Sequence, residues 1–579
     1  FFETLNRRRP DDASDNWGST RWDRDERSFM PYLNGGIFDI DKVVDHWDFD
    51  TEKPMFLIPD AVFSADRDYD PALDDESLSG RQVNILAFLD DYHFTIAEDT
   101  PVDEAVALDP ELMGKIFENL LVSRHSDGAY YTPRSIVRFQ CKDTLARYLE
   151  EQLADIGGLD HDWFLTLFDL DRDFSDRRTW DEELFTPVVA DRIEAALKEC
   201  KVLDPAVGSG AYLLGMLTEM LRLRQLCHMV RTGHMVDRGS IEFYRWKSEI
   251  IRDSLYGVDI NPEAVAICHL RLWLAMVVDQ DRESASPLPN LDFQVTAGDS
   301  LRDSINGHRI FVAPGQKGQS TIWSYMDGED EDGPNDEPIK ARIDRIHELR
   351  HEYYDENASP SKRDETRTEL QRLRQQMMIE GLDQLEHYEL EQLKKSNMST
   401  TKKNKAENDV IAKFNDTRSR INEGTFTSIF SYEAIFGDVF QRDGRKGFDI
   451  IIGNPPYLLD QGDGGLNSNY KDIQKSLGLA SDNLYAMFWA KSIKQLARNG
   501  GQVSFITPDT PLTIRGHKET REILLQNGTI HYAIQAGNWF FTFNNAMTAI
   551  LTMSVNRNRA LHESQSVKNT LIAYDITKL

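Results

Sequence analysis

The residues best suited to chemistry are four consecutive ones, Asn454, Pro455, Pro456 and Tyr457, which directly follow an apolar run at 448–453. Two successive prolines cannot continue a strand ladder, because proline has no N–H to donate, so they predict a rigid loop at a strand end. The amide oxygen of Asn454 and the carbonyl of Pro455 can both accept hydrogen bonds from a planar amine. Tyr457 offers a flat face for stacking on a base. The loop therefore predicts chemistry on an amino group, aimed at an electrophilic methyl group.

A second candidate site consists of three acidic residues that each end a short apolar run. Asp204 precedes a turn with Gly208 and Gly210 that opens a helix, a pattern that lets the backbone approach a ligand closely. Asp259 ends the next run, where a carboxylate can hold two ribose hydroxyls. Asp299 ends a third run and can reach an adenine amino group. Three successive strands that end in this way predict one crevice for a nucleoside-containing cofactor.

These residues meet only if a parallel sheet brings the strand ends together. From residue 201 short apolar runs alternate with helical patterns, which is typical of an α/β fold with a mostly parallel, doubly wound sheet. Strands are expected at 201–203, 254–258, 293–297, 448–452 and 502–506, with a closing pair near 533–536 and 546–555. Helices are expected from 210, at 262–277 and at 483–496. Thr132 and Pro133 predict the cap and first turn of a preceding helix.

The pattern divides the chain into four segments. Residues 1–110 form an acidic, partly helical N-terminal region, and residues 111–302 form the first part of the core, with the cofactor half. Residues 303–446 form a mainly helical insertion, and residues 447–579 complete the core with the catalytic loop. Within the insertion, Leu and Ile spacing predicts two long helices packed as a hairpin from near Ile339. Ser396 to Asn408 is expected to be a lysine-rich loop whose simplest interpretation is a solvated surface.

Composition limits the function classes. With 40% hydrophobic and 10% aromatic residues the chain is globular, and it shows neither a membrane span nor a signal peptide, so a cytoplasmic location is expected. The four cysteines form no CxxC pair, which argues against disulfides and against a zinc site, and no metal is expected. The 66 basic and 97 acidic residues give a net charge of −31, which opposes binding to a polyanion. A nucleic-acid function must therefore rest on the motifs.

Together the motifs resemble the S-adenosylmethionine-dependent N6-adenine DNA methyltransferases in the gamma arrangement, whose cofactor motif precedes NPPY. The resemblance covers most of 112–555 outside the insertion. It is strongest to the type IIG restriction-modification and BREX-type phage-defence methyltransferases, through LNGGIF at 33–38, GAYYTP at 128–133 and GFDIIIGNPPY. It implies a Rossmann-like methyltransferase fold with a helical N-terminal region and a helical insertion. The implied activity is site-specific methyl transfer from S-adenosylmethionine to the N6 amine of a flipped adenine in double-stranded DNA.

The resemblance also implies roles for particular residues. Tyr131, Thr132 and Pro133 correspond to the lining of the methionine end of the cofactor. Asp204, Gly208 and Gly210 correspond to residues around its amino acid and sulfonium, Asp259 to the ribose-binding residue and Asp299 to the adenine-binding residue. The resemblance also includes Ala206, Ile260 and Ser300 among the cofactor-binding positions. The family further places an aromatic ring against the flipped base, for which Phe541 and Phe543 are both candidates, and their spacing does not decide between them.

Two other functions are open. A protein glutamine N5-methyltransferase also holds a planar amide with NPPY, but such enzymes resemble a compact chain without the insertion or GAYYTP. A non-catalytic DNA-binding or partner-docking module of a defence complex is disfavoured, because every cofactor and catalytic position is intact. Double-stranded DNA is the expected partner, and other defence-system subunits are further candidates. No convincing PD-(D/E)xK nuclease motif occurs and no target recognition domain is expected within the chain, so type IIG and BREX-type membership both stay open.

Overall fold

The computed structural model describes the chain in separate stretches. These are residues 47–48, 53–54, 132–169, 184–277, 291, 293–305, 308–309, most of 342–353, 360–396, 398–423, 430–457 apart from 441 and 443, 470–480, 483–537 and 547–557. The expected N-terminal region at 1–110 lies outside them, except for the paired strands β1 (Trp47–Asp48) and β2 (Lys53–Pro54). Two compact units are present, and the larger one, Glu118–Val236, Arg245–Cys268 and Leu291–Leu579, holds both predicted sites.

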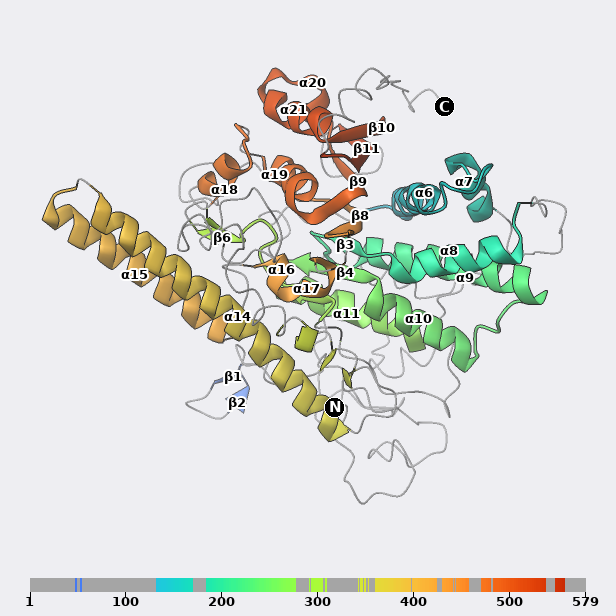
Figure 1. The fold of residues 1–579 in the computed structure, drawn as a ribbon, viewed down its shortest axis with the longest axis horizontal. Coiled ribbons are helices and arrows are strands. Elements are labelled where there is room, and N and C mark those ends of the chain that lie inside the picture. The colour runs from blue at the N-terminus through green and yellow to red at the C-terminus, as the bar shows by residue number, and fades with distance from the viewer. Residues whose placement is uncertain are drawn as a thin grey trace, which may run out of the picture. The chain divides into compact units, whose positions relative to one another are not determined.

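A seven-stranded sheet forms the centre of the larger unit, in the order β10-β11-β9-β8-β3-β4-β5 (Figure 1). Its strands, in chain order, are β3 (Val202–Asp204), β4 (Leu255–Asp259), β5 (Val295–Ala297), β8 (Phe448–Gly453), β9 (Ala497–Pro508), β10 (Gly528–Gly537) and β11 (Thr548–Val555). The five strands from β9 to β5 are parallel neighbours, and β11 is antiparallel to both β9 and β10. The predicted mostly parallel sheet is confirmed, and so is the closing strand pair. A separate short hairpin joins β6 (Ser304–Ile305) to β7 (His308–Arg309).

Apart from the helices of the insertion, the helices lie before and after β8 in the chain, and some of them pack on each face of the sheet. Before β8 they are α6 (Arg134–Gln152), α7 (His161–Asp169), α8 (Pro187–Glu199), α9 (Ala211–Thr232), α10 (Ile241–Asp253), α11 (Pro262–Val277), α16 (Tyr432–Ile435) and α17 (Gly437–Phe440). After β8 they are α18 (Lys471–Ser476), α19 (Leu484–Lys491) with the π-helical turn η4 (Ser492–Leu496), α20 (Thr510–Thr513), η5 (Arg515–His517) and α21 (Lys518–Gln526). Successive strand residues point to opposite faces. Phe505 and Leu551 accordingly pack with α16, α17 and α19, whereas Ile506 and Ile550 pack on Ile136 of α6. The sheet is therefore doubly wound.

The insertion contains two long helices, α14 (Pro360–Lys395) and α15 (Thr400–Asn422), which pack side by side (Figure 1). The prediction of two long helices packed together is confirmed, but two of its bounds are wrong. The first long helix begins at Pro360 rather than near Ile339, and from Thr400 onward the residues of the predicted loop at 396–408 belong to α15. Lysine and alanine are good helix formers, and the lack of apolar residues there concealed the helix. Arg374 ties α14 to the core, because its guanidinium donates to the carbonyl of Ile435 at 2.7 Å and lies over the ring of Phe293.

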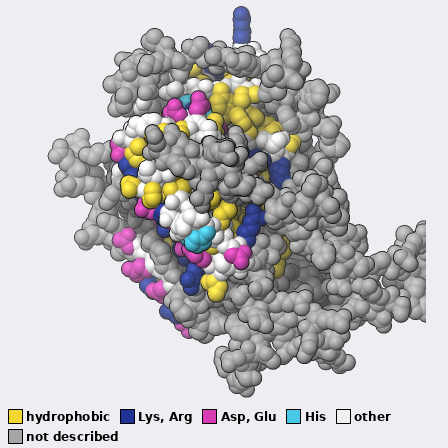
Figure 2. Space-filling model, turned by 90° about the vertical axis from the view of Figure 1, so that its right-hand side faces the viewer, with side chains coloured by type: hydrophobic (Ala, Val, Ile, Leu, Met, Phe, Trp, Pro, Cys, Tyr) yellow, Lys and Arg dark blue, Asp and Glu magenta, His cyan; other side chains and the backbone are white. Residues whose placement is uncertain are grey.

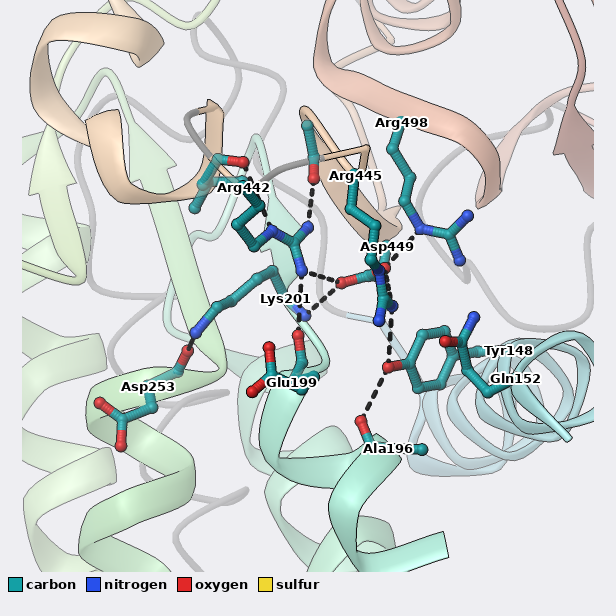
Figure 3. Close-up of polar contacts among 12 residues, drawn as sticks. Tyr148, Gln152, Ala196, Glu199, Lys201, Asp253, Arg442, Arg445, Asp449 and Arg498 are labelled. Carbon is teal, nitrogen blue, oxygen red and sulfur yellow. Dashed lines mark hydrogen bonds and ion pairs between the residues drawn. The ribbon is translucent and has the colours of Figure 1, made fainter. Parts of the chain in front are cut away.

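A buried carboxylate holds the amino-terminal edge of the sheet together (Figure 3). Asp449 at the start of β8 is fully buried and forms ion pairs with Arg442 at 2.8 Å, with Arg445 at 2.7 Å and with Arg498. It also accepts the backbone N–H of Lys201, just before β3, at 2.9 Å. Burial alone would raise the pKa of Asp449, but the three guanidinium groups outweigh burial and hold that pKa below its usual value. The cluster thereby fixes β8 beside β3.

All four cysteines are buried free thiols, as expected from their spacing. Figure 2 shows Asp and Glu side chains on the same described face as Lys, Arg and exposed apolar side chains, so that face presents both signs of charge. Among the helices that the structure describes, none combines the length and the hydropathy needed to cross a lipid bilayer.

Candidate functional site

The two predicted motifs touch at the carboxyl ends of β3 and β8. These strands are parallel neighbours, so the turn after Asp204 and the loop after Gly453 emerge side by side. A methyl group added to Gly453 would lie only 2.7 Å from Oδ1 of Asp204. This close approach needs glycine, and it brings the loop Asn454–Tyr457 against the predicted cofactor turn.

The turn after β3 combines a buried carboxyl with two glycines of left-handed backbone conformation. Asp204 is buried, and its Oδ1 accepts the N–H of Ala206 at 3.1 Å. Burial raises the pKa of the Asp204 carboxyl well above its usual range, and nearby Asp259 adds to that rise. Gly208 and Gly210 have φ angles of +50° and +89°, in the left-handed region that favours glycine. Apart from its two chain neighbours, no atom of the described residues lies within 4 Å of a Cβ placed on Gly208, so its backbone borders open space.

Asp259 connects β4 to this turn. Its Oδ2 accepts the N–H of Gly208 at 2.8 Å and its Oδ1 accepts the N–H of Asn261 at 2.9 Å. Asp259 as a whole is half-buried. The next side chain, Ile260, is 46% exposed, which is unusual for isoleucine and leaves an aliphatic surface beside the carboxylate.

The two side chains that follow β5, those of Asp299 and Ser300, form hydrogen bonds to other parts of the protein. Oδ2 of the buried Asp299 accepts the hydroxyl of Tyr470 at 2.7 Å, and its Oδ1 accepts the N–H of Leu301 at 3.1 Å. Burial raises the pKa of Asp299, although Tyr470 and Arg302 oppose the rise. The hydroxyl of Ser300 donates to the carbonyl of Pro205, which links the β5 and β3 loops. Asp299 and Ser300 thus join the β5 loop to Tyr470 and to the β3 loop.

The catalytic-loop candidates are held from two sides. The amide Nδ2 of Asn454 donates to the hydroxyl of Thr132 at 3.1 Å, and the hydroxyl of Tyr457 donates to the carbonyl of Ile506 in β9 at 3.3 Å. Thr132 is buried, whereas Asn454 and Tyr457 are half-buried. The prediction that Thr132 caps a helix is wrong, since the N-cap of α6 is Pro133 and no side chain caps it. The threonine hydroxyl instead fixes the asparagine amide.

Three predicted site residues cannot be placed, and two residues of the site were not predicted from the sequence. Tyr131, Phe541 and Phe543 lie outside the described residues. Gly453 and Tyr470 were not identified as site residues. Only Gly453 had a usable signal, a glycine directly before the two prolines.

Residues 253–541 match the Eco57I restriction-modification methylase family. The chain contains an Eco57I restriction-modification methylase domain. This methylase domain includes Asp259, Asp299 and the loop 454–457, while Asp204 and the glycine turn precede the matched segment. The predicted family resemblance is therefore confirmed.

Two curated relatives are similar to the chain. A Methanocaldococcus jannaschii protein, provisionally named a type II restriction enzyme and methyltransferase, is 26% identical over 545 residues, which cover 88% of this chain and 40% of that protein. The adenine-specific methyltransferase PglX of Streptomyces coelicolor is 31% identical over 110 residues, 19% of this chain and 8% of that protein. The chain thus spans less than half the length of either relative. The DNA-bound structure of the type IIL restriction-modification enzyme MmeI is 12% identical, covering 99% of this chain and 49% of that one, with a TM-score of 0.41.

Proposed function

We propose that this chain is the catalytic part of a site-specific DNA methyltransferase that moves a methyl group from S-adenosylmethionine to the N6 amine of adenine, in a restriction-modification or phage-defence system. The observation that carries the proposal is the contact between Gly453 and Asp204. It sets a loop suited to a planar amine directly against a turn suited to a nucleoside cofactor. In this proposal residues 111–302 and 447–579 are the two halves of one catalytic core.

The turn after β3 fits S-adenosylmethionine. Gly208 borders open space, where a ligand can approach the backbone, and the start of α9 lies next to it. A carboxyl whose pKa burial has raised, as in Asp204, gains strongly from a cationic partner such as the cofactor ammonium. Asp259 binds the ribose hydroxyls, and the exposed Ile260 packs on the adenine. When bound, S-adenosylmethionine supplies a methyl group on a positively charged sulfur.

The loop 454–457 binds and orients the target amine. Oδ1 of Asn454 and the carbonyl of Pro455 accept its two N–H groups, which directs the nitrogen lone pair out of the ring plane. Tyr457 stacks on the base. An adenine within a duplex cannot reach this loop, so it is flipped out of the stack. The two accepting oxygens also stabilise the positive charge that develops on the amine, and no strong general base is required.

Double-stranded DNA is the proposed partner, and subunits of a defence system are further proposed partners. The names of the two curated relatives support this choice, since both are methyltransferases and one is adenine-specific. They give no support to methylation of a protein glutamine.

The test is tritiated methyl transfer by the full-length protein to genomic DNA from its host after deletion of the gene, followed by nucleoside analysis. N6-methyladenine is the expected product. Asn454→Ala should abolish transfer and leave the affinity for S-adenosylmethionine nearly unchanged, because the amide contacts the amine rather than the cofactor. Methylcytosine as product, methylation of protein instead of DNA, or an Asn454→Ala enzyme with normal turnover would refute the proposal.

A further inference from the structure

A continuous series of hydrogen-bonded side chains connects the catalytic loop to α6. We call it the Asp143–Asn454 network, and its members in order are Asn454, Thr132, Tyr212, Gln140, Ser504, Thr552, Tyr532 and Asp143. Asn454 and Tyr532 are half-buried and the other six are buried. For six of the seven links the donor–acceptor distances lie between 2.6 and 3.1 Å. The seventh link, between Thr132 and Tyr212, is identified by its effect on the phenol: burial raises the pKa of Tyr212 and the hydrogen bond from Thr132 opposes the rise.

The direction of these hydrogen bonds is set at the Asp143 end. Asp143 lies 3.1 Å from Nε of Arg147 and 2.9 Å from Nε2 of His161. Burial would raise the pKa of Asp143, but hydrogen bonds from His161 and Arg147 and the charge of Arg147 lower it, so the group is an ionised carboxylate. An ionised carboxylate can only accept hydrogen bonds. Tyr532 must therefore donate to Asp143, across 2.8 Å.

Each following group has its direction imposed by its neighbour. Tyr532 has one proton and gives it to Asp143, so it must accept from Thr552 at 2.8 Å. Thr552 has then used its own proton and must accept from Ser504 at 2.7 Å. Ser504 in turn must accept, and Nε2 of Gln140 lies 2.9 Å away.

Gln140 sets the direction of the next hydrogen bond in the network, because its side-chain amide donates through Nε2 and accepts through Oε1. With Nε2 turned to Ser504, Oε1 faces the hydroxyl of Tyr212 and accepts from it at 2.6 Å. Tyr212 must then accept from Thr132, and Thr132 must accept from Asn454. Only the NH2 end of the Asn454 amide can satisfy this last requirement.

We propose that Asp143 fixes the orientation of the Asn454 amide through this network, so that Nδ2 faces Thr132 and Oδ1 faces the opposite side, toward the target amine. The inference rests on the proposed function for the identity of that amine. Gln140 is then a positioning residue: it touches neither substrate nor cofactor and acts on the reaction through Asn454. Because Tyr212 lies in the first turn of α9, the same network also joins Asn454 to the helix that follows the glycine turn.

The decisive variants change Gln140 and Tyr532. Gln140→Leu cuts the network and should lower kcat for methyl transfer about five- to tenfold, the effect of one lost oriented hydrogen bond. KM for DNA and the affinity for S-adenosylmethionine should stay unchanged. Gln140→Glu should restore kcat in either protonation state of the new carboxyl, because an ionised carboxyl accepts from Tyr212 and a protonated one also donates to Ser504, as Gln140 does. Tyr532→Phe should lower kcat in the wild type but not in the Gln140→Leu background, where the network is already cut. Thr520→Val removes another buried hydroxyl, in α21 and outside the network, and should change nothing.

A readout independent of activity completes the test. With isotope-labelled asparagine, the side-chain amide of Asn454 should give one set of NMR signals in the wild type and in Gln140→Glu, and two sets or broadened signals in Gln140→Leu. Its signals are assigned by their loss in Asn454→Asp. A Gln140→Leu protein with wild-type kcat and one set of signals would overturn the inference, as would an equal effect of Tyr532→Phe in both backgrounds. If Gln140→Glu fails to fold, Gln140→Leu and the amide signals decide. A wild type that transfers no methyl group refutes the proposed function, and the amide signals then still decide about the network.

Discussion

Substituting Gly453 with alanine tests how tightly the two loops of the site fit together. The added methyl group would lie 2.7 Å from Oδ1 of Asp204, 3.4 Å from its Cγ and 3.6 Å from Cε1 of Phe505. An ordinary contact starts at 3.4 Å, so the two loops must separate by 3.4 − 2.7, or about 0.7 Å. Neither side yields easily, because Asp204 is buried and held by the N–H of Ala206, while Gly453 is paired within the sheet.

The expected result is a loss of activity without loss of the fold. A misplacement of about 1 Å can cost on the order of 100-fold in rate, so kcat/KM for methyl transfer should fall on the order of 10- to 100-fold. Initial rates of tritiated methyl transfer measure this loss, calorimetry measures the affinity for S-adenosylmethionine, and urea unfolding measures stability. Gly516→Ala is the matched control, since a Cβ there meets no atom within 4 Å and its φ is not positive. A Gly453→Ala enzyme that turns over as fast as Gly516→Ala would refute the close fit as a catalytic requirement.

Four further results are expected. Tyr457→Ala should lose a stacking energy of about 1–3 kcal/mol in kcat/KM. Tyr457→Phe keeps the ring, removes the hydroxyl that donates to Ile506 and should keep most of the activity; equal losses in both variants would exclude stacking. Asp259→Ala should weaken binding of S-adenosylmethionine by about 1–3 kcal/mol in calorimetry, and unchanged affinity would remove Asp259 from the site. Asp449→Asn should lower the free energy of unfolding by about 3–5 kcal/mol, because it leaves three guanidinium groups around a neutral amide. Since the folded pKa of Asp449 lies below its unfolded value of about 4, this difference should be complete above about pH 5 and shrink as the pH falls through the folded pKa; urea titrations at several pH values measure it, and a difference that grows in acid would contradict the ion-pair account. Finally, with a net charge of −31 this chain alone should bind DNA weakly and with steep salt dependence in fluorescence anisotropy, and tight sequence-specific binding at physiological salt would contradict that expectation.

The strand ends and the catalytic loop could be predicted because their signals are local. Most of the strands are apolar runs closed by an aspartate, a glycine or a proline, which are residue types that disfavour the interior of a strand. The predicted helix at 262–277 has the bounds of α11, and the strands differ from their predicted ranges mostly at their ends, with β9 beginning five residues earlier.

The polar contacts of the site could not be predicted in the same way. Gln140 and Ser504 are 364 positions apart, and Asp143 and Tyr532 are 389 apart. No periodicity relates positions at such separations, and a single buried glutamine has the same local sequence signal whether or not it is in a network. Thr132 was misjudged for a related reason, since threonine before proline is a common helix cap and its actual contact lies 322 positions away.

The place of the helical hairpin in the sequence has a consequence for how the protein is made. β3 lies in the middle of the sheet, yet one of its neighbours, β8, is synthesised about 245 residues later, and until then that side of β3 has open hydrogen-bonding groups. Bringing two strands together across so long a flexible segment is entropically costly. α14 and α15 form contacts between residues close in sequence and return the chain toward its starting point, so they shorten the loop that must still be closed. We expect a nascent chain that ends before Phe448 to need a chaperone, and the hairpin to fold before the catalytic core is complete.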